Sequence, residues 1–121
     1  MIKISNIQDI TVNISITSLD AIWKGDTRKL PPNKTYELLI DYPLTYPAKF
    51  EIKTGKTGMD FLKLLKIIGE KYIEIYDAEP DSAYCDDDGS YGIWGHSIDD
   101  LCLEGLTINH KTKKIRLDIG S

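Results

Sequence analysis

Imidazole and carboxylate side chains that could do chemistry lie close together near residue 96. His96 is followed by Asp99 and Asp100. A neutral imidazole titrates near working pH, so His96 could act as a general base, or bind a catalytic metal ion, beside these carboxylates. This spacing gives the hypothesis of a metal-dependent, hydrolase-like enzyme with His96, Asp99 and Asp100 as candidate catalytic residues. We favour a non-enzymatic role, because no second motif supports this hypothesis.

The acidic run Asp86-Asp87-Asp88-Gly89 could bind a divalent metal ion. Hard cations such as calcium prefer several carboxylates on a loop with a glycine turn. When Gly89 is aligned with the glycine of an EF-hand loop, however, Tyr84 and Gly95 occupy the two positions that need acidic ligands. We therefore favour a solvated acidic loop and predict no cofactor. A divalent metal in an irregular loop is the alternative, with the candidate ligands Asp86, Asp88, His96 and Asp99.

The two cysteines and two histidines do not have the spacing of a zinc site. Ten residues separate Cys85 from His96, and seven separate Cys102 from His110. Structural zinc sites usually supply their ligands in close pairs, so this spacing argues against zinc.

The segment Thr54-Gly-Lys-Thr-Gly58 contains part of a phosphate-binding P-loop motif. The full motif needs an earlier glycine, so that consecutive backbone N–H groups can wrap the phosphates. Phe50 stands at that position, inside a predicted strand. We interpret the segment as a turn that leads into a helix cap.

Aromatic residues are interspersed with the acidic ones between residues 77 and 100. One interpretation is a packed corner, in which Gly89, Gly92 and Gly95 allow tight turns and Trp94 anchors to the core. The other is an exposed aromatic rim around carboxylates, which is common at protein interfaces. The candidate binding residues of that rim are Tyr84, Asp86, Asp87, Asp88, Tyr91 and Trp94.

The charge of the chain is unevenly distributed. Its formal net charge is -4, yet the segment Asp77 to Asp100 carries eight acidic residues and no Lys or Arg. An acidic end of this kind would attract a basic protein partner. A basic stripe with exposed aromatics is not apparent, so nucleic acid is not favoured as a partner. Our leading hypothesis is an interaction or regulatory module that uses the acidic, aromatic segment 77–100; a purely structural or oligomerisation domain is a further alternative.

Length and composition favour one small domain. The chain has 121 residues, of which 41% are hydrophobic and 28% charged. These values are typical of one soluble globular domain spanning residues 1–121, with no membrane-spanning run. The first residues lack the apolar core of a signal peptide, and two cysteines are too few for a disulfide framework, so we expect a cytoplasmic location. The sequence does not indicate an oligomeric state.

Alternation of apolar and polar residues predicts five strands. The last hairpin needs an irregularity, since Leu101 and Leu103 are out of register with Leu106 and Ile108. A bulge at Gly105 would correct this slip. The predicted strands are 9–17, 35–42, 48–53, 101–110 and 114–119.

The segment 59–80 predicts the strong helix of the chain. Apolar residues recur every three or four positions from Phe61 to Tyr76, and charged residues occupy the opposite face. Thr57 followed by Asp60 resembles a capping box. The element order predicts a two-layer α+β fold, in which one long helix packs on a mainly antiparallel sheet of about five strands. A β-grasp-like arrangement is one such topology.

Overall fold

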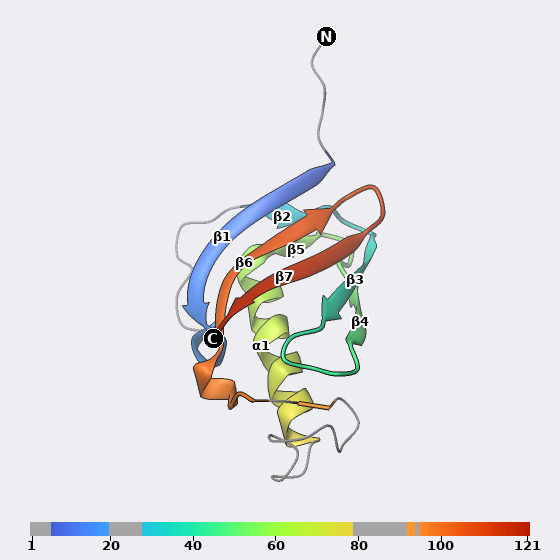
Figure 1. Ribbon diagram of the computed structural model, residues 1–121. Helices are drawn as coiled ribbons and strands as arrows, with labels where there is room; N and C mark the ends of the chain where they lie inside the picture. The colour runs from blue at the N-terminus through green and yellow to red at the C-terminus, as the bar shows by residue number, and fades with distance from the viewer. Residues whose placement is uncertain (1–5, 20–27, 79–91, 94) are drawn as a thin grey trace.

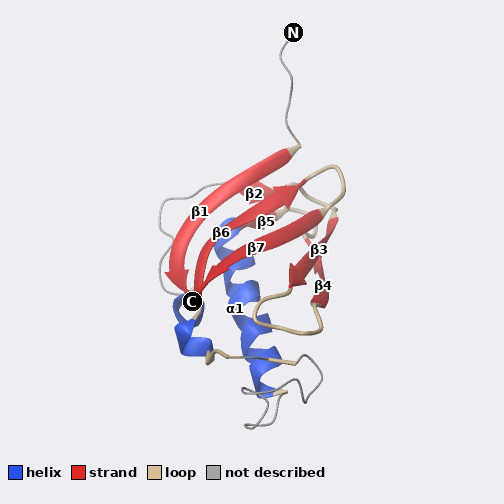
Figure 2. Cartoon of the chain, viewed as in Figure 1, coloured by secondary structure: helices blue, strands red, loops and turns tan. Residues whose placement is uncertain are grey.

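The protein has an α+β fold in which one helix packs on a mixed five-stranded sheet (Figures 1 and 2). The computed structural model describes residues 6–19, 28–78, 92–93 and 95–121. The large sheet contains β1 (Ile7–Ser15), β3 (Thr35–Ile40), β4 (Ala48–Lys53), β6 (Cys102–Asn109) and β7 (Lys114–Gly120). All five lie where apolar and polar residues alternate, so the strand predictions are confirmed to within two residues at each end.

The large sheet has the strand order β1-β6-β7-β3-β4 and is mixed, because its neighbouring pairs differ in direction. Three neighbouring pairs, β1/β6, β6/β7 and β3/β4, are antiparallel, whereas β3 and β7 are parallel. The chain leaves the β3/β4 hairpin, passes through the helix and returns to the sheet in the β6/β7 hairpin. The helix therefore forms part of the connection that allows two parallel strands to lie side by side.

The helix α1 (Phe61–Asp77) begins at Asp60, whose carboxylate accepts a hydrogen bond from the backbone N–H of Lys63 at 2.9 Å. The predicted capping box at Thr57 is therefore wrong. Asp60 itself has the extended conformation of a cap residue, and its side chain reaches the third residue of the helix. The helix begins one turn later than the motif suggested.

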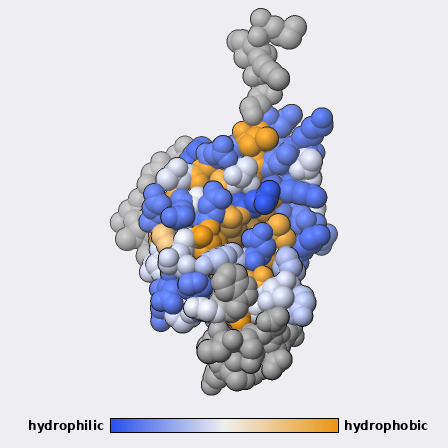
Figure 3. Space-filling view, in the orientation of Figure 1, coloured by the Kyte–Doolittle hydropathy of each residue, from blue (hydrophilic) through white to orange (hydrophobic). Residues whose placement is uncertain are grey.

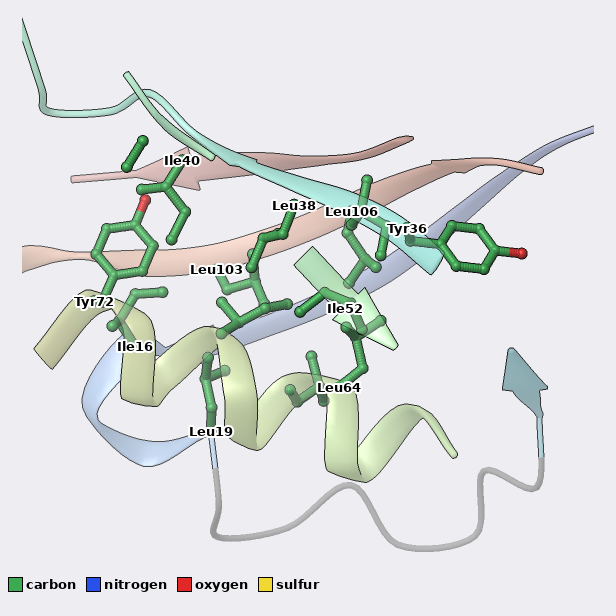
Figure 4. Close-up of a cluster of buried hydrophobic side chains, with 14 of the residues drawn as sticks. Ile16, Leu19, Tyr36, Leu38, Ile40, Ile52, Leu64, Tyr72, Leu103 and Leu106 are labelled. Atoms are coloured by element: carbon green, nitrogen blue, oxygen red, sulfur yellow. The ribbon is translucent and has the colours of Figure 1, made fainter. Parts of the chain in front are cut away.

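The apolar face of α1 covers one face of the sheet. Leu64, Leu65 and Ile68 are no more than 1% exposed, and in Figure 4 Leu64 lies between the helix and strand residues such as Leu38 and Leu103. This layer is the hydrophobic core.

A second, two-stranded sheet was missed by the sequence interpretation. β2 (Lys29–Leu30) pairs antiparallel with β5 (Met59–Asp60), and the backbone N–H of Phe61 donates to the carbonyl oxygen of Arg28 at 3.3 Å. Strands of two residues are too short to show alternation, so the pattern predicted no strand between residues 17 and 35. This pairing fixes the chain just before the helix.

The predicted bulge in the last hairpin is confirmed. The register of β6 against β7 shifts between Leu103 and Gly105. A side chain at Gly105 would place its Cβ 2.6 Å from the carbonyl oxygen of Ile10, so only glycine allows β1 to approach β6 this closely. A second shift interrupts β1 between Thr11 and Ile14, which the strict alternation of that strand did not predict.

In the described part of the chain, no helix has the length and apolar character needed to cross a membrane.

Two isoleucines on α1 test the position of the core. Ile68 is 0% exposed and Ile73 is 48% exposed. Ile68→Ala should lower the free energy of unfolding by about 2–5 kcal/mol, because it leaves a cavity in the layer under the sheet. The matched Ile73→Ala change should alter it by less than about 0.5 kcal/mol. Denaturant unfolding measures both; equal losses would contradict this assignment of the buried face.

Candidate functional site

The structure describes three of the sequence-predicted site residues. His96 is half-buried, and it precedes a single 3-10 turn, Ile98–Asp100, on which Asp99 and Asp100 are exposed. The six residues of the predicted aromatic and acidic rim lie outside the described residues: Tyr84, Asp86, Asp87, Asp88, Tyr91 and Trp94.

The imidazole of His96 contacts side chains from distant parts of the chain. Its Nε2 shares a 2.9 Å hydrogen bond with the hydroxyl of Tyr42, just beyond β3. The hydroxyl of Ser121 lies 2.8 Å from that of Tyr42 and 3.4 Å from Nε2. On the other side of the ring, Nδ1 lies 4.0 Å from a carboxylate oxygen of Asp100.

Two tyrosines one turn apart on α1 hold the backbone of the same site. The hydroxyl of Tyr72 donates to the carbonyl oxygen of Tyr42 at 2.8 Å, and that of Tyr76 donates to the carbonyl oxygen of His96 at 3.0 Å. Residues four apart lie on the same helix face, so both hydroxyls reach the same end of the sheet. We call Tyr42, Tyr72, Tyr76, His96 and Ser121 the tyrosine–histidine cluster.

Burial fixes the role of Tyr72 in this cluster. Its side chain is fully buried. Burial, with smaller contributions from Tyr76, Asp41 and Tyr42, raises the pKa of Tyr72 well above its ordinary value of 10.0. The hydroxyl therefore stays protonated and keeps donating to Tyr42 throughout the physiological pH range.

The cluster has the order of groups, but not the spacing, of a serine–histidine–carboxylate relay. Proton transfer requires distances of about 2.6–3.2 Å. The serine and carboxylate contacts of His96 measure 3.4 and 4.0 Å, and the hydroxyl of Tyr42 holds the nearer position. The geometry is that of a clamp, which joins α1, the end of β3 and the segment before β6.

The described residues around His96 were compared with the ligand set of a metal site. Within the described ranges, no group of three or more His, Cys, Asp or Glu side chains is placed to hold a metal ion. Of the candidate ligands, His96 and Asp99 are described, whereas Asp86 and Asp88 lie outside those ranges. Cys102 is a free, half-buried thiol.

The described part of the YGIWGH segment is packed. Ile93 is 0% exposed and forms an isolated bridge with Leu44. Gly92 has a φ of 62°, and a Cβ there would lie 2.6 Å from Cβ of Thr45. The expectation of tight glycine turns is confirmed at Gly92 and at Gly95, whose φ is 73°. The segment is therefore tied to the turn after β3.

A second histidine lies in the turn between β6 and β7. The Nε2 atom of His110 lies 2.9 Å from the side-chain oxygen of Gln8, and Nδ1 lies 2.8 Å from the hydroxyl of Tyr36. The Gln8 oxygen can only accept, so Nε2 carries the proton and Nδ1 accepts from Tyr36. Burial, and secondarily the charge of Lys113, lower the pKa of His110.

Sequence reasoning missed the tyrosines as site residues. The helical period predicts Tyr72 and Tyr76 only as members of the apolar helix face, and alternation predicts Tyr42 only as a strand residue. A buried tyrosine usually needs a partner for its hydroxyl, so two tyrosines on a buried helix face were the available signal. Ser121 carried no comparable signal.

Comparisons of the chain with protein families, with curated proteins and with solved structures find no match.

The position of His110 predicts how stability changes with pH. Because its pKa is lower in the folded protein than the ordinary 6.5, the unfolded chain takes up the proton first. The free energy of unfolding should therefore fall as the pH decreases below 6.5. Above pH 6.5 His110 is neutral in both states, so it should add no pH dependence there. In His110→Gln this part of the slope should disappear.

The matched control is His96→Gln, which removes the other histidine. Urea unfolding between about pH 7.5 and 5.5 brackets the ordinary histidine pKa and avoids most carboxylate titration. An identical slope in His110→Gln and the unmodified chain would show that His110 binds its proton equally well in both states.

Proposed function

We propose that the protein is a non-enzymatic interaction module that presents its acidic, aromatic segment 77–100 to a basic protein partner. The observation that carries this proposal is the way in which both ends of the segment are held. Asp77 ends α1, and the Tyr76 hydroxyl next to it donates to the carbonyl oxygen of His96, near the other end. Anchoring groups that are already fixed before binding lower the entropy cost of association.

The charge around these anchors supports the same proposal. Asp77, Asp99 and Asp100 are exposed, and so is Asp41, next to the tyrosine–histidine cluster. The other acidic residues of the segment lie between Asp77 and Asp99 in the sequence, and no Lys or Arg stands among them. Like charges at one end of a molecule create a field that steers a cationic partner and speeds association. A cytoplasmic location and a protein partner, rather than nucleic acid or a membrane, are part of this proposal.

We also infer a β-grasp-like topology. A hairpin, a helix and a second hairpin follow one another, and the first strand of one hairpin lies parallel to the last strand of the other. The mainly antiparallel pairing and the 17-residue α1 support this inference. A fold of this kind hosts many functions, so it adds nothing to the choice of partner.

A metal-dependent enzyme is the second candidate, because His96 and Asp100 lie 4.0 Å apart. Thermal unfolding after chelation, with calcium, magnesium, manganese or zinc added back, separates it from the first. A metal at about a hundred times its dissociation constant stabilises by roughly 2.7 kcal/mol. A shift of the melting temperature that His96→Ala abolishes would favour the metal site over the interaction module.

The interaction proposal is tested by neutralising the acidic run. Asp86→Asn, Asp87→Asn and Asp88→Asn together should abolish recovery of basic proteins in a pull-down, because the attracting charge is lost, and should leave the melting temperature within a few degrees. The matched control removes three acids elsewhere, by Glu70→Gln, Glu74→Gln and Asp118→Asn. We expect the control to recover the same proteins as the unmodified chain. Equal recovery by all three forms would refute the role of this segment.

A further inference from the structure

The two edges of the large sheet differ in regularity. At one edge, β1 carries a register shift between Thr11 and Ile14, and Asn13 has a φ of 56°. Such irregularities prevent another strand from pairing along an edge. At the other edge, β4 pairs with β3 in one unbroken register from Ala48 to Lys53. Figure 2 shows β4 beside β3. The β4 edge is therefore the regular one.

The register shows which backbone groups of β4 face outward. The N–H of Thr54 donates to the carbonyl oxygen of Lys34 at 2.9 Å. Hydrogen-bonded pairs alternate along an antiparallel ladder, so every second residue of β4 points its N–H and C=O away from β3. These residues are Lys49, Glu51 and Lys53. All three are exposed, and in the described ranges β4 has no strand partner other than β3.

A groove of about 290 Å³ runs between β4 and α1. Its floor is apolar, with Ile52 and Met59 buried and Ile67 half-buried. On the helix side it is lined by Lys63, Ile67, Glu70 and Lys71. An added strand beside β4 would direct alternate side chains into this groove, because side chains of a strand alternate between its two faces. The space suits apolar side chains of a partner strand.

Lysines outnumber carboxylates around the groove and along the edge, where Glu51 and Glu70 are the acidic residues. Lys49 and Lys53 lie on the outer face of β4, and Lys63 on the helix side; none of the three has an ion pair with another described residue. Lys71 is engaged, since its Nζ lies 3.1 Å from Glu74 and 5.0 Å from the ring centroid of Phe50.

The charge of β4 favours an acidic partner over a second copy of this chain. In an antiparallel pairing of two β4 strands centred on Glu51, Lys49 of each copy would lie opposite Lys53 of the other, and like charges directly opposite are destabilising. Carboxylates in those positions would instead attract. Figure 3 shows that hydrophilic residues predominate along one side of the face it displays, whereas hydrophobic ones gather near its middle.

We propose that the β4 edge binds an extended segment of another protein in which apolar and acidic residues alternate. The segment adds as a sixth strand, with its apolar side chains in the groove above Ile67 and its carboxylates toward Lys49 and Lys53. Backbone hydrogen bonds supply affinity in this mode, and alternate side chains supply specificity. This site uses the opposite charge from the acidic segment 77–100 and is independent of it.

The probe is a capped seven-residue peptide, Val-Asp-Val-Thr-Val-Glu-Val, whose two carboxylates would lie toward Lys49 and Lys53 and whose threonine would lie opposite Glu51. It is added to the isotope-labelled full chain and followed by NMR. We expect chemical-shift changes confined to β4 and to residues 63–71 of α1. The amides of Lys49, Glu51 and Lys53 should become protected from hydrogen exchange, whereas those of Phe50 and Ile52 already bond to β3 and should change little. A peptide with Lys in place of Asp and Glu should not bind.

Two variants test the two parts of the proposal. Glu51→Pro removes an outward N–H from an edge position where proline is tolerated, and should weaken binding at least tenfold. Lys49→Glu with Lys53→Glu should do the same through charge, and remains informative if the proline variant does not fold. Lys111→Glu with Arg116→Glu is the matched control, with the same charge change at two exposed residues that do not line the groove, and should bind within about twofold of the unmodified chain.

Three results would overturn the proposal. The first is no binding at about 1 mM peptide, a free energy weaker than about -4 kcal/mol. The second is binding that both β4 variants retain, or that shifts only residues outside β4 and α1. The third is a dimer by light scattering that Glu51→Pro dissociates, because β4 would then be occupied by a second copy.

Discussion

The apolar layer between α1 and the sheet is the interaction on which the rest of the structure depends. β3 and β7 are parallel neighbours, so the chain between them must cross the sheet, and α1 forms part of that crossing. Its buried face, which includes Leu65 and Ile68, fixes the rotation of the helix about its own axis. The polar groups at both ends and along one side of the helix are placed by this packing.

Two consequences follow from the orientation of α1 about its own axis. At the end of the helix, Tyr72 and Tyr76 point to the backbone of Tyr42 and His96, which ties the segment before β6 to the turn after β3. Along its side, Lys63 and Ile67 face the edge strand β4 and form a groove. One helix thus holds the backbone of His96 at its end and forms one wall of the groove beside β4. Both proposals of binding surfaces start from these two placements.

The sequence was most informative where a physical period extended over several residues. Five strands and the helix each bury one face, so their apolar residues recur with a period of two or of about 3.6 residues, and this period is visible in the sequence. The bulge at Gly105 was predictable because a phase slip is visible in the pattern. β2 and β5 were not, because a two-residue pairing is decided by which distant segments meet. The cap at Asp60 was assigned to Thr57, because several polar residues precede the helix and geometry chooses among them.

The site was less predictable than the fold. His96 was identified as a chemical group, but its partners Tyr42 and Ser121 are 54 and 25 residues away, and no local pattern connects them. The clamp depends on the tertiary position of the end of α1. The position of β4 at an edge of the sheet also could not be predicted from the sequence, because strand order, not alternation, determines which strand lies at an edge.

Native-state amide hydrogen exchange, followed by NMR across a series of denaturant concentrations, tests the central role of the helix most directly. We expect the amides of Leu65 and Ile68 in α1 and of Leu38 and Ile115 in β3 and β7 to exchange with one common free energy of opening, equal to that of global unfolding. A lower free energy of opening for α1, with β3 and β7 still protected, would contradict it. The parallel pair would then be held together without the helix.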